Sequence, residues 1–294
     1  MNLDKIEWLQ VENTTQCNAW CPACSRNQAG YGLTPDLEIE DLSLNRFAEV
    51  LDALPGLKVI QFCGNHGDTM AAQQAYEHIK LAKKHSNKIQ IHTHGSLRNT
   101  LWWKDLALLL SDIEHNVWFG IDGLKGVHEI HRQATDFDKV IENAQAFIDH
   151  GGQATWQFIP FEHNEHQIKD CLKMSQKMGF KKFKLANIVR YNLNARHWKT
   201  GEPIFFKPWS RNQTTDPYQV ITTRNIIKHE YCRHLVKKSL YLNANGNISH
   251  CCYLNLQRQY QLLDALDDIA AEIQHKPDSK CLNICGDGAR IKEL

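Results

Sequence analysis

A regular alternation of short β-rich segments and amphipathic helical segments runs through the first part of the chain. Six candidate strands contain Val, Ile, Phe or Trp at the density typical of strands. They are Trp8–Asn13, Lys58–Cys63, Ile89–Thr93, Asn116–Ile121, Thr155–Pro160 and Phe183–Asn187. Segments with helical periodicity lie between them, at Leu44–Leu54, Ala72–Ala82, Leu101–Ile113, Phe137–Ile148 and Ile168–Met178. This alternation predicts an α/β fold in which right-handed crossovers join parallel strands.

The number of strand–helix units selects among the parallel architectures. Six units fall short of the eight that a complete barrel contains. We therefore expect a partial (β/α)6 TIM-type barrel, with an open doubly wound sheet as the alternative. Both architectures place functional side chains in the loops after the carboxyl ends of the strands. This chain has Gly, Asn, Asp and His in those loops, although turn formation alone also explains Gly and Asp in any single loop.

The charge and hydropathy of the chain exclude several classes of protein. The 294 residues include 34 Lys and Arg against 33 Asp and Glu, which gives a formal net charge of +1. This balance excludes an overall polycation that binds nucleic acid through phosphate neutralisation alone. No apolar run approaches the roughly 20 residues of a membrane-spanning helix, and the charged N-terminal residues do not resemble a secretory signal. We expect a cytoplasmic protein with neither a membrane nor a nucleic-acid partner.

The ten cysteines of the chain are unevenly distributed. In a reducing compartment, thiols favour metal ligation or catalysis over disulfide formation. The first group is Cys17, Cys21 and Cys24, and the second is Cys232, Cys251, Cys252, Cys281 and Cys285. Cys63 and Cys171 lie between the groups, and we interpret them as core residues because a free cysteine behaves as a small hydrophobic side chain.

The first group has C-x3-C-x2-C spacing in the loop after the first predicted strand. Three thiolates can hold one small inorganic centre and leave one coordination position open. That centre is either a catalytic zinc ion or a four-iron cluster with one iron free for an outside ligand. A closed structural zinc site is a further interpretation, but no second Cys/His pair at a suitable spacing lies nearby in the sequence.

With this spacing in this loop, the chain resembles the radical S-adenosylmethionine (SAM) superfamily. The resemblance implies that Cys17, Cys21 and Cys24 bind a [4Fe-4S] cluster whose open iron chelates SAM. Electron transfer from the cluster then cleaves SAM to methionine and a 5′-deoxyadenosyl radical, which abstracts a hydrogen atom from the substrate. A reducing partner such as flavodoxin or ferredoxin is also implied. Trp20, directly before Cys21, would pack beside the adenine of SAM.

The same resemblance implies a SAM-binding turn after the second strand. In the family, a Gly-Gly-Glu-Pro-like turn at this place binds the amino group of the SAM methionine. Here the turn contains Gly64, Asn65, Gly67 and Asp68, so Asp stands in place of Glu, and Thr69 in place of Pro. These four residues of the turn are therefore candidate SAM contacts.

The remaining candidate SAM contacts follow the third and fourth strands. Thr93 and Ser96 belong to a segment that looks like the family's Thr-Asn-Gly turn. Asp122 belongs to a segment that looks like its Ser-Ile-Asp-Gly strand, with Gly120 where a ribose-binding Ser is often found. Arg132 resembles a family residue that can reach the SAM carboxylate.

The second group of cysteines flanks a hairpin pattern at Leu240–Ser249, with Asn245-Gly246 at its turn. This region resembles the twitch domain, the shortened form of the SPASM extension, which holds one auxiliary [4Fe-4S] cluster. The resemblance implies four ligands, Cys232, Cys251, Cys281 and Cys285. Cys252 is expected not to bind the cluster, because it is adjacent to Cys251 and adjacent residues of a strand face opposite sides. A zinc ribbon built from the same thiols is the alternative.

We therefore divide the chain into a radical SAM partial barrel (1–190), a linker (191–231) and an auxiliary cluster domain (232–294) made of a hairpin and a helix at Leu262–Ile273. The predicted function is that of a radical SAM enzyme that modifies a peptide or protein. Dehydrogenation of a small molecule (a sugar, nucleotide or alcohol) by the same radical chemistry is the first alternative. A non-catalytic iron–sulfur or zinc-binding protein is the alternative from another class.

Overall fold

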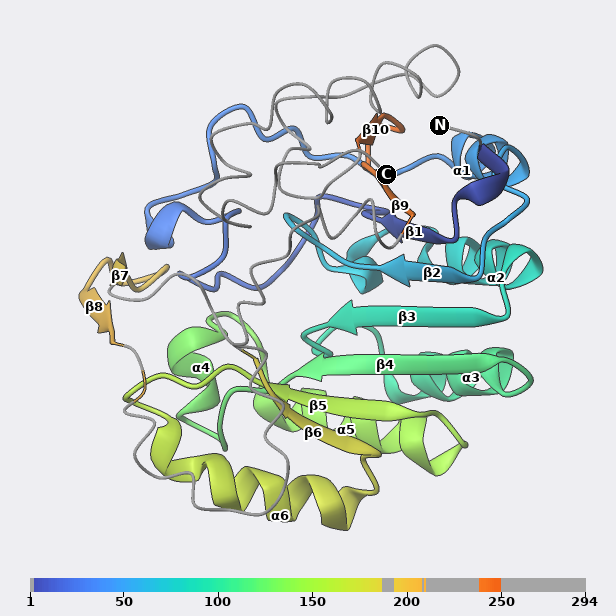
Figure 1. Ribbon diagram of the computed structural model, residues 1–294. Coiled ribbons are helices and arrows are strands. Elements are labelled where there is room, and N and C mark those ends of the chain that lie inside the picture. The colour runs from blue at the N-terminus through green and yellow to red at the C-terminus, as the bar shows by residue number, and fades with distance from the viewer. Residues whose placement is uncertain (1–2, 187–192, 208, 210–237, 250–294) are drawn as a thin grey trace, which may run out of the picture.

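A computed structural model describes residues 3–186, 193–207, 209 and 238–249. Its central element is an eight-stranded, mostly parallel sheet in the order β10-β9-β1-β2-β3-β4-β5-β6 (Figure 1). The first six strands of the chain are β1 (Trp8–Val11), β2 (Val59–Phe62), β3 (Lys88–Thr93), β4 (Glu114–Gly120), β5 (Ala154–Phe158) and β6 (Lys182–Leu185). The expected α/β class with parallel strands is confirmed.

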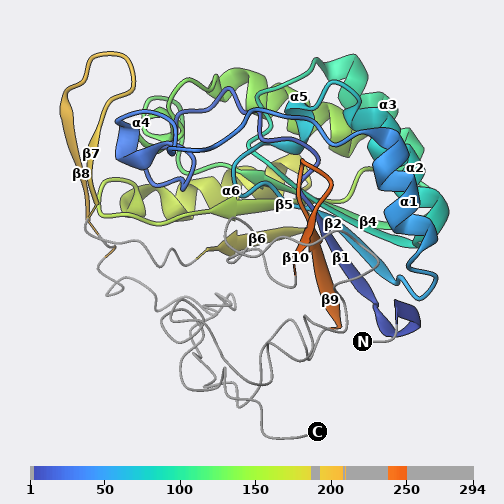
Figure 2. The same ribbon diagram turned by 90° about the horizontal axis from the view of Figure 1, so that it is seen from above.

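Five longer helices connect these strands and cover one side of the sheet (Figure 2). They are α1 (Leu44–Asp52), α2 (Ala75–His85), α3 (Thr100–Leu110), α5 (Phe137–Asp149) and α6 (Ile168–Met178). The shorter helices are η1 (Leu3–Lys5), η2 (Gln28–Gly30), η3 (Thr69–Ala71), α4 (His128–His131) and η4 (Glu165–Gln167). The side chains of Ser43, Asn99 and Asp136 cap α1, α3 and α5 by accepting from a backbone N–H of the first turn.

The order of the strands distinguishes the two architectures that the sequence allowed. A doubly wound sheet has a point at which the strand order reverses, with helices on both faces. Here β1 to β6 follow one another without a reversal, and the five helices lie on the same face (Figure 2). The described residues therefore exclude the doubly wound alternative.

The two faces of the sheet differ in chemistry because successive side chains of a strand point to opposite sides. The helix-covered face is apolar and fully buried, and includes Ile60, Ile91 and Phe119 in the main core. The opposite face carries a line of half-buried amides that are neighbours in register across four strands. This amide row consists of Gln10, Gln61, Gln90 and Asn116.

Two hairpins follow the six-strand unit. The first, formed by β7 (Leu193–Arg196) and β8 (Pro203–Phe206), lies in the segment that we expected to be a linker. The second, formed by β9 (Ser239–Leu242) and β10 (Ile248–Ser249), confirms the hairpin pattern at the Asn-Gly turn. However, β9 pairs in parallel with β1 and so joins the main sheet. No helix in the described part of the chain is long and apolar enough to cross a membrane.

Candidate functional site

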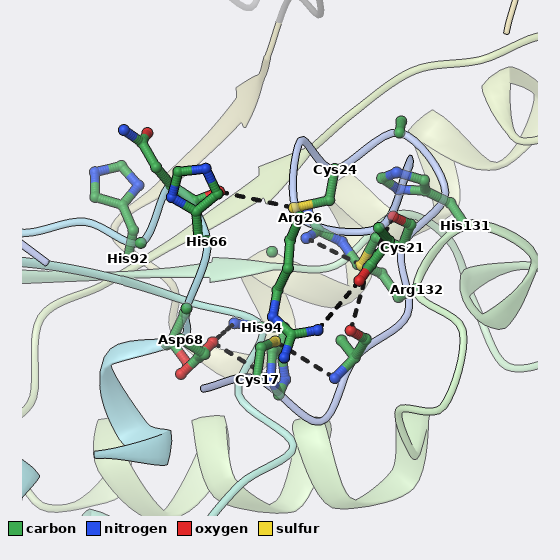
Figure 3. Close-up of a pocket in the computed structure, with 18 of the residues that line it drawn as sticks. Cys17, Cys21, Cys24, Arg26, His66, Asp68, His92, His94, His131 and Arg132 are labelled. Carbon is green, nitrogen blue, oxygen red and sulfur yellow. Dashed lines mark hydrogen bonds and ion pairs between the residues drawn. The ribbon is translucent and has the colours of Figure 1, made fainter. Parts of the chain in front are cut away.

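The first group of cysteines lines one cavity of about 240 Å³ at the carboxyl ends of the strands (Figure 3). Cys21 is buried, and Cys17 and Cys24 are half-buried. The loop after β2 and the ends of β3, β4 and β5 supply further lining residues, which include Gly64, Asn65, His66, Gly67, Asp68, His92, Thr93, His94, Gly120 and Gln157. The structure thus brings together the cysteine loop and the loops that the sequence singled out.

Backbone and amide hydrogen bonds shape the cysteine loop. The backbone N–H of Cys24 donates to the carbonyl of Cys21 over 3.0 Å. The buried side chain of Asn27 donates to the carbonyls of Cys21 and Ala19 at 3.2 and 3.4 Å. In addition, the N–H of Ala19 lies 3.4 Å from the sulfur of Cys17. These contacts hold the three thiols on the cavity side of the loop.

Burial disfavours the charged form of two of these thiols, Cys17 and Cys21. Burial raises the pKa of Cys21 to about 11, although the guanidinium of Arg132 acts in the opposite direction. Burial also raises the pKa of Cys17, and the negative charge of Asp68 adds to this effect. A metal centre would replace the thiol protons and offset the negative charge. Three soft sulfur donors around a cavity of about 240 Å³ fit a multi-atom iron–sulfur centre with room for one outside ligand.

Asp68 fastens the loop after β2 to the end of β3. Its two carboxylate oxygens each lie 3.0 Å from the hydroxyl of Thr93, and they accept from the N–H groups of Met70 at 2.9 Å and His94 at 2.8 Å. Ser96, which does not line the cavity, contacts the ring of His94 through its N–H and hydroxyl. Asp68 and Thr93 thus bind each other as well as facing the cavity.

Glu12 is a site residue that sequence reasoning missed. It is 2% exposed, and one of its oxygens accepts from the N–H groups of His66 and Gly67 at 2.6 and 3.1 Å. The other oxygen accepts from the hydroxyl of Tyr241 on β9 at 2.7 Å. The sequence carried one signal, a carboxylate directly after an apolar strand. Its partners could not be inferred, because Tyr241 is 229 residues away.

The two glycines of the β2 loop allow a close approach of backbone to backbone. A Cβ atom at Gly64 would lie 1.5 Å from the carbonyl oxygen of Gly67. At Gly67, a Cβ atom would lie 1.9 Å from the carbonyl oxygen of Thr14. Glycine is therefore required at both positions by the lack of space.

Asp122 is fully buried and connects three segments behind the cavity. One oxygen accepts from Nδ1 of His131 at 2.7 Å and from Nε of Arg132 at 2.6 Å. The other oxygen accepts from the N–H of Ile159 at 2.7 Å. Burial alone would raise the pKa of Asp122, but the charge of Arg132 and the hydrogen bond from His131 hold it below its usual range. Asp122 does not line the cavity, whereas Arg132 and His131 do.

Trp20 also lies outside the cavity lining. Its indole stacks on that of Trp198, with ring centroids 6.1 Å apart and planes within 10°. The guanidinium of Arg26 lies 5.9 Å from the same ring. Gln133 joins both tryptophans, because its backbone carbonyl and side-chain oxygen each accept a backbone N–H at 2.8 Å. In this structure Trp20 binds the segment that follows β7.

The β7–β8 hairpin packs directly on the cysteine loop. Ala195 and Phe206 form a small buried cluster with Phe161, and Ala23 and Ala29 of the cysteine loop pack against it. The sequence led us to expect a linker here, and the contact of this segment with the cysteine loop was not predictable from spacing. The hairpin therefore covers one side of the candidate site.

Two further cysteines lie within the described residues, and neither lines the cavity. Cys171 is fully buried on α6, which confirms its interpretation as a core residue. Cys63 is half-buried after β2 and does not line the cavity. The predicted auxiliary ligands Cys232, Cys251, Cys281 and Cys285, and the adjacent Cys252, lie outside the described residues, as does the predicted helix at Leu262–Ile273.

No protein-family model matches the chain, and no curated protein matches it in sequence. Several solved structures match it in fold. Streptococcus suis SuiB bound to S-adenosylmethionine is 15% identical, with a TM-score of 0.63 over 96% of this chain and 71% of that chain. SuiB bound to the precursor peptide SuiA is 14% identical, with a TM-score of 0.63 over 96% of this chain and 70% of that chain. The structure of anSMEcpe with bound AdoMet is 19% identical, with a TM-score of 0.51 over 64% of this chain and 51% of that chain. At these identities, the similarity establishes a shared fold.

Proposed function

We propose that this chain is a radical SAM enzyme built on a partial (β/α)6 barrel. The observation that carries the proposal is the placement of Cys17, Cys21 and Cys24 around one cavity at the carboxyl edge of the parallel sheet. The shared fold with SuiB, whose structure contains S-adenosylmethionine, supports it. The three thiolates would hold a [4Fe-4S] cluster, which supplies the electron for cleavage of SAM and formation of the 5′-deoxyadenosyl radical.

The surrounding side chains have two proposed tasks. Residues that line the cavity and have groups directed to it would contact SAM, and these are Gly64, Asn65, Gly67 and Arg132. Residues whose polar atoms bind other loops would hold that cavity in shape, and these are Asp68, Thr93, Ser96 and Asp122. Trp20, which the sequence suggested for adenine, is proposed instead to fasten the β7–β8 hairpin over the cysteine loop.

A peptide or protein is the proposed substrate. The structure of SuiB with the precursor peptide SuiA supports this class, since the two proteins share a fold. The amide row on the face of the sheet opposite the described helices supports it as well, because side-chain amides both donate to and accept from peptide groups. A hydrogen atom of the substrate would be abstracted at the cavity mouth, where exclusion of water prevents side reactions of a carbon radical.

The proposal includes an auxiliary [4Fe-4S] cluster held by Cys232, Cys251, Cys281 and Cys285 in a C-terminal extension. Such a cluster would take up the second electron of a net two-electron oxidation. A flavodoxin or ferredoxin would deliver the electron that the N-terminal cluster needs for SAM cleavage, and the chemistry requires a reducing compartment such as the cytoplasm. The three-part division at 190 and 231 remains a prediction, with β9 now assigned to the main sheet.

Anaerobic reconstitution of the full chain tests the proposal. We expect about eight iron and eight sulfide per chain, as two four-iron clusters require, and release of 5′-deoxyadenosine from SAM under reduction. The double variant Cys17→Ala/Cys21→Ala should abolish SAM cleavage, and Cys281→Ala should retain about half of the iron. Cys171→Ala is the matched control, because this cysteine is buried outside the cavity, and it should retain both properties.

Three other results of this experiment would each point to a different function or substrate. Bound zinc without sulfide and without SAM cleavage would indicate a zinc-binding protein. Iron and sulfide without SAM cleavage would indicate an electron carrier. If the wild-type chain cleaves SAM but turns over no peptide, the peptide assignment is wrong. A sugar, nucleotide or alcohol substrate would then be the class to screen.

A further inference from the structure

The end of β4 leaves room for one guanidinium group. A Cβ atom added at Gly120 would lie 2.7 Å from Nη2 and 3.0 Å from Cζ of Arg132. No backbone strain calls for glycine here, because Gly120 is not among the residues with positive φ. The side chain of Arg132 therefore fills the space that a larger residue at position 120 would take.

Arg132 is held between a carboxylate and a thiol. Its Nε donates to Asp122 at 2.6 Å, and its Nη1 lies 4.0 Å from the sulfur of Cys21. The side chain is 17% exposed, while that of Asp122 is fully buried. Since His131 and Ile159 hold Asp122 in turn, the guanidinium has little freedom to leave the sulfur.

A cation in this place stabilises negative charge on Cys21. Hydrogen bonds to cluster sulfurs and nearby charge are among the protein's means of setting the potential of an iron–sulfur centre. Arg132 offers both, an N–H of Nη1 directed at the sulfur and a positive charge that Asp122 balances from the Nε side. The added electron makes the cluster more negative, so a neighbouring cation favours the reduced form.

We propose that Arg132 is a positioning residue that acts through the thiolate of Cys21 and raises the reduction potential of the N-terminal cluster. Gly120 provides the space for it, and Asp122 holds its orientation. This inference rests on the proposed function, because it assumes a cluster on Cys21. It goes beyond a contact with SAM, since the effect is present before SAM binds.

An electron paramagnetic resonance redox titration of the reconstituted full chain, without SAM, tests the inference. The N-terminal cluster is identified as the signal that changes when SAM is added. We expect Arg132→Gln to lower its midpoint potential and Arg132→Lys to recover part of the loss, since Lys keeps the charge. Gly120→Ser should lower the potential as well, because it displaces the guanidinium while leaving Arg132 and Asp122 intact.

Arg26 provides the matched control. It is 6% exposed, lines the same cavity and donates to Thr15 and Asn27 rather than to a sulfur. Arg26→Gln should therefore shift the potential less than Arg132→Gln does. Equal shifts in the two variants, or no shift in Arg132→Gln and Gly120→Ser, would overturn the inference. Failure of the wild-type chain to assemble any cluster would instead overturn the proposed function.

Discussion

At the scale of single residues, buried carboxylates organise the candidate site. Glu12, Asp68 and Asp122 each lie in a loop that follows a strand, and each accepts hydrogen bonds from backbone N–H groups of a neighbouring loop. Backbone donors suit this task because their positions are fixed by the fold. The residues that surround the cysteines are therefore largely occupied in fixing the loops.

The first prediction concerns Asp122. Replacing it with Asn should lower the free energy of unfolding by about 3 kcal/mol, because the buried charge of Arg132 loses its partner. Urea unfolding measures this value. Asp138→Asn is the control, since Asp138 pairs with Lys125 on the surface, where an ion pair contributes at most about 1 kcal/mol. Equal losses in the two variants would contradict the role assigned to Asp122.

The sequence was enough to predict residues that surround the cysteines. It was not enough to predict the hydrogen-bond partners of those residues. Asp68 and Asp122 were selected from the sequence as SAM contacts because they lie in strand-end loops, and the structure does place them at or behind the cavity. Their hydrogen bonds to Thr93 and Arg132 depend on the relative positions of loops that are separate in the sequence. Periodicity and spacing carry no information about such distances.

At the scale of secondary structure, the elements with strong periodicity were predicted well. The prediction for α6 has the observed ends, and the six predicted strands overlap β1 to β6 with ends within two residues. The β7–β8 hairpin was missed, because its strands are short and lie among polar residues and turn formers. The pairing of β9 with β1 was also missed, since local sequence does not specify a partner so distant along the chain.

The second prediction concerns the contact between the β7–β8 hairpin and the cysteine loop. At Gly30, where φ is +87°, an added Cβ atom would lie 2.0 Å from the carbonyl oxygen of Arg196. Gly30→Ala should therefore separate the hairpin from the loop. Faster amide hydrogen exchange across 193–206, together with a change in the fluorescence of the stacked Trp20 and Trp198, would report the separation.

Gly126→Ala is the control for this prediction. Gly126 has nearly the same φ, +86°, but an added Cβ atom meets nothing within 4 Å. The control should lose about 1 kcal/mol of stability from the left-handed backbone alone, with hydrogen exchange in the hairpin unchanged. If both variants affect the hairpin equally, close packing at Gly30 is not what holds it.

At the scale of the whole molecule, many histidines are held neutral. Burial lowers the pKa of six of them within the described segments, namely His78, His92, His94, His128, His131 and His163. For example, the pKa of His92 is lowered to about 4 and that of His128 to about 3. An unfolded chain takes up these protons below about pH 6.5, whereas the folded chain does not.

The third prediction follows from this difference. The free energy of unfolding should fall as the pH drops from about 6.5 toward 4, because protons bind preferentially to the unfolded state in this range. Each buried histidine contributes a slope of up to about 1.4 kcal/mol per pH unit. Urea unfolding at pH 7.5, 6.5 and 5.5 and constant ionic strength measures the slope. A constant or rising stability over this range would show that the imidazoles take up protons in the folded state.

The pairing of β1 with β9 has a consequence for synthesis of the chain. The first strand is made early, but its outer neighbour, which also supplies the Tyr241 hydroxyl to Glu12, is made 229 residues later. At about 5–20 residues per second on the ribosome, this interval is roughly 10 to 50 s. During that time one edge of β1 has no strand to bind, and an open edge invites pairing with other chains. A nascent chain that stalls before residue 239 should therefore depend on chaperones to stay unaggregated. Glu12, which binds the loop after β2, gains its contact with Tyr241 only once β9 has been made.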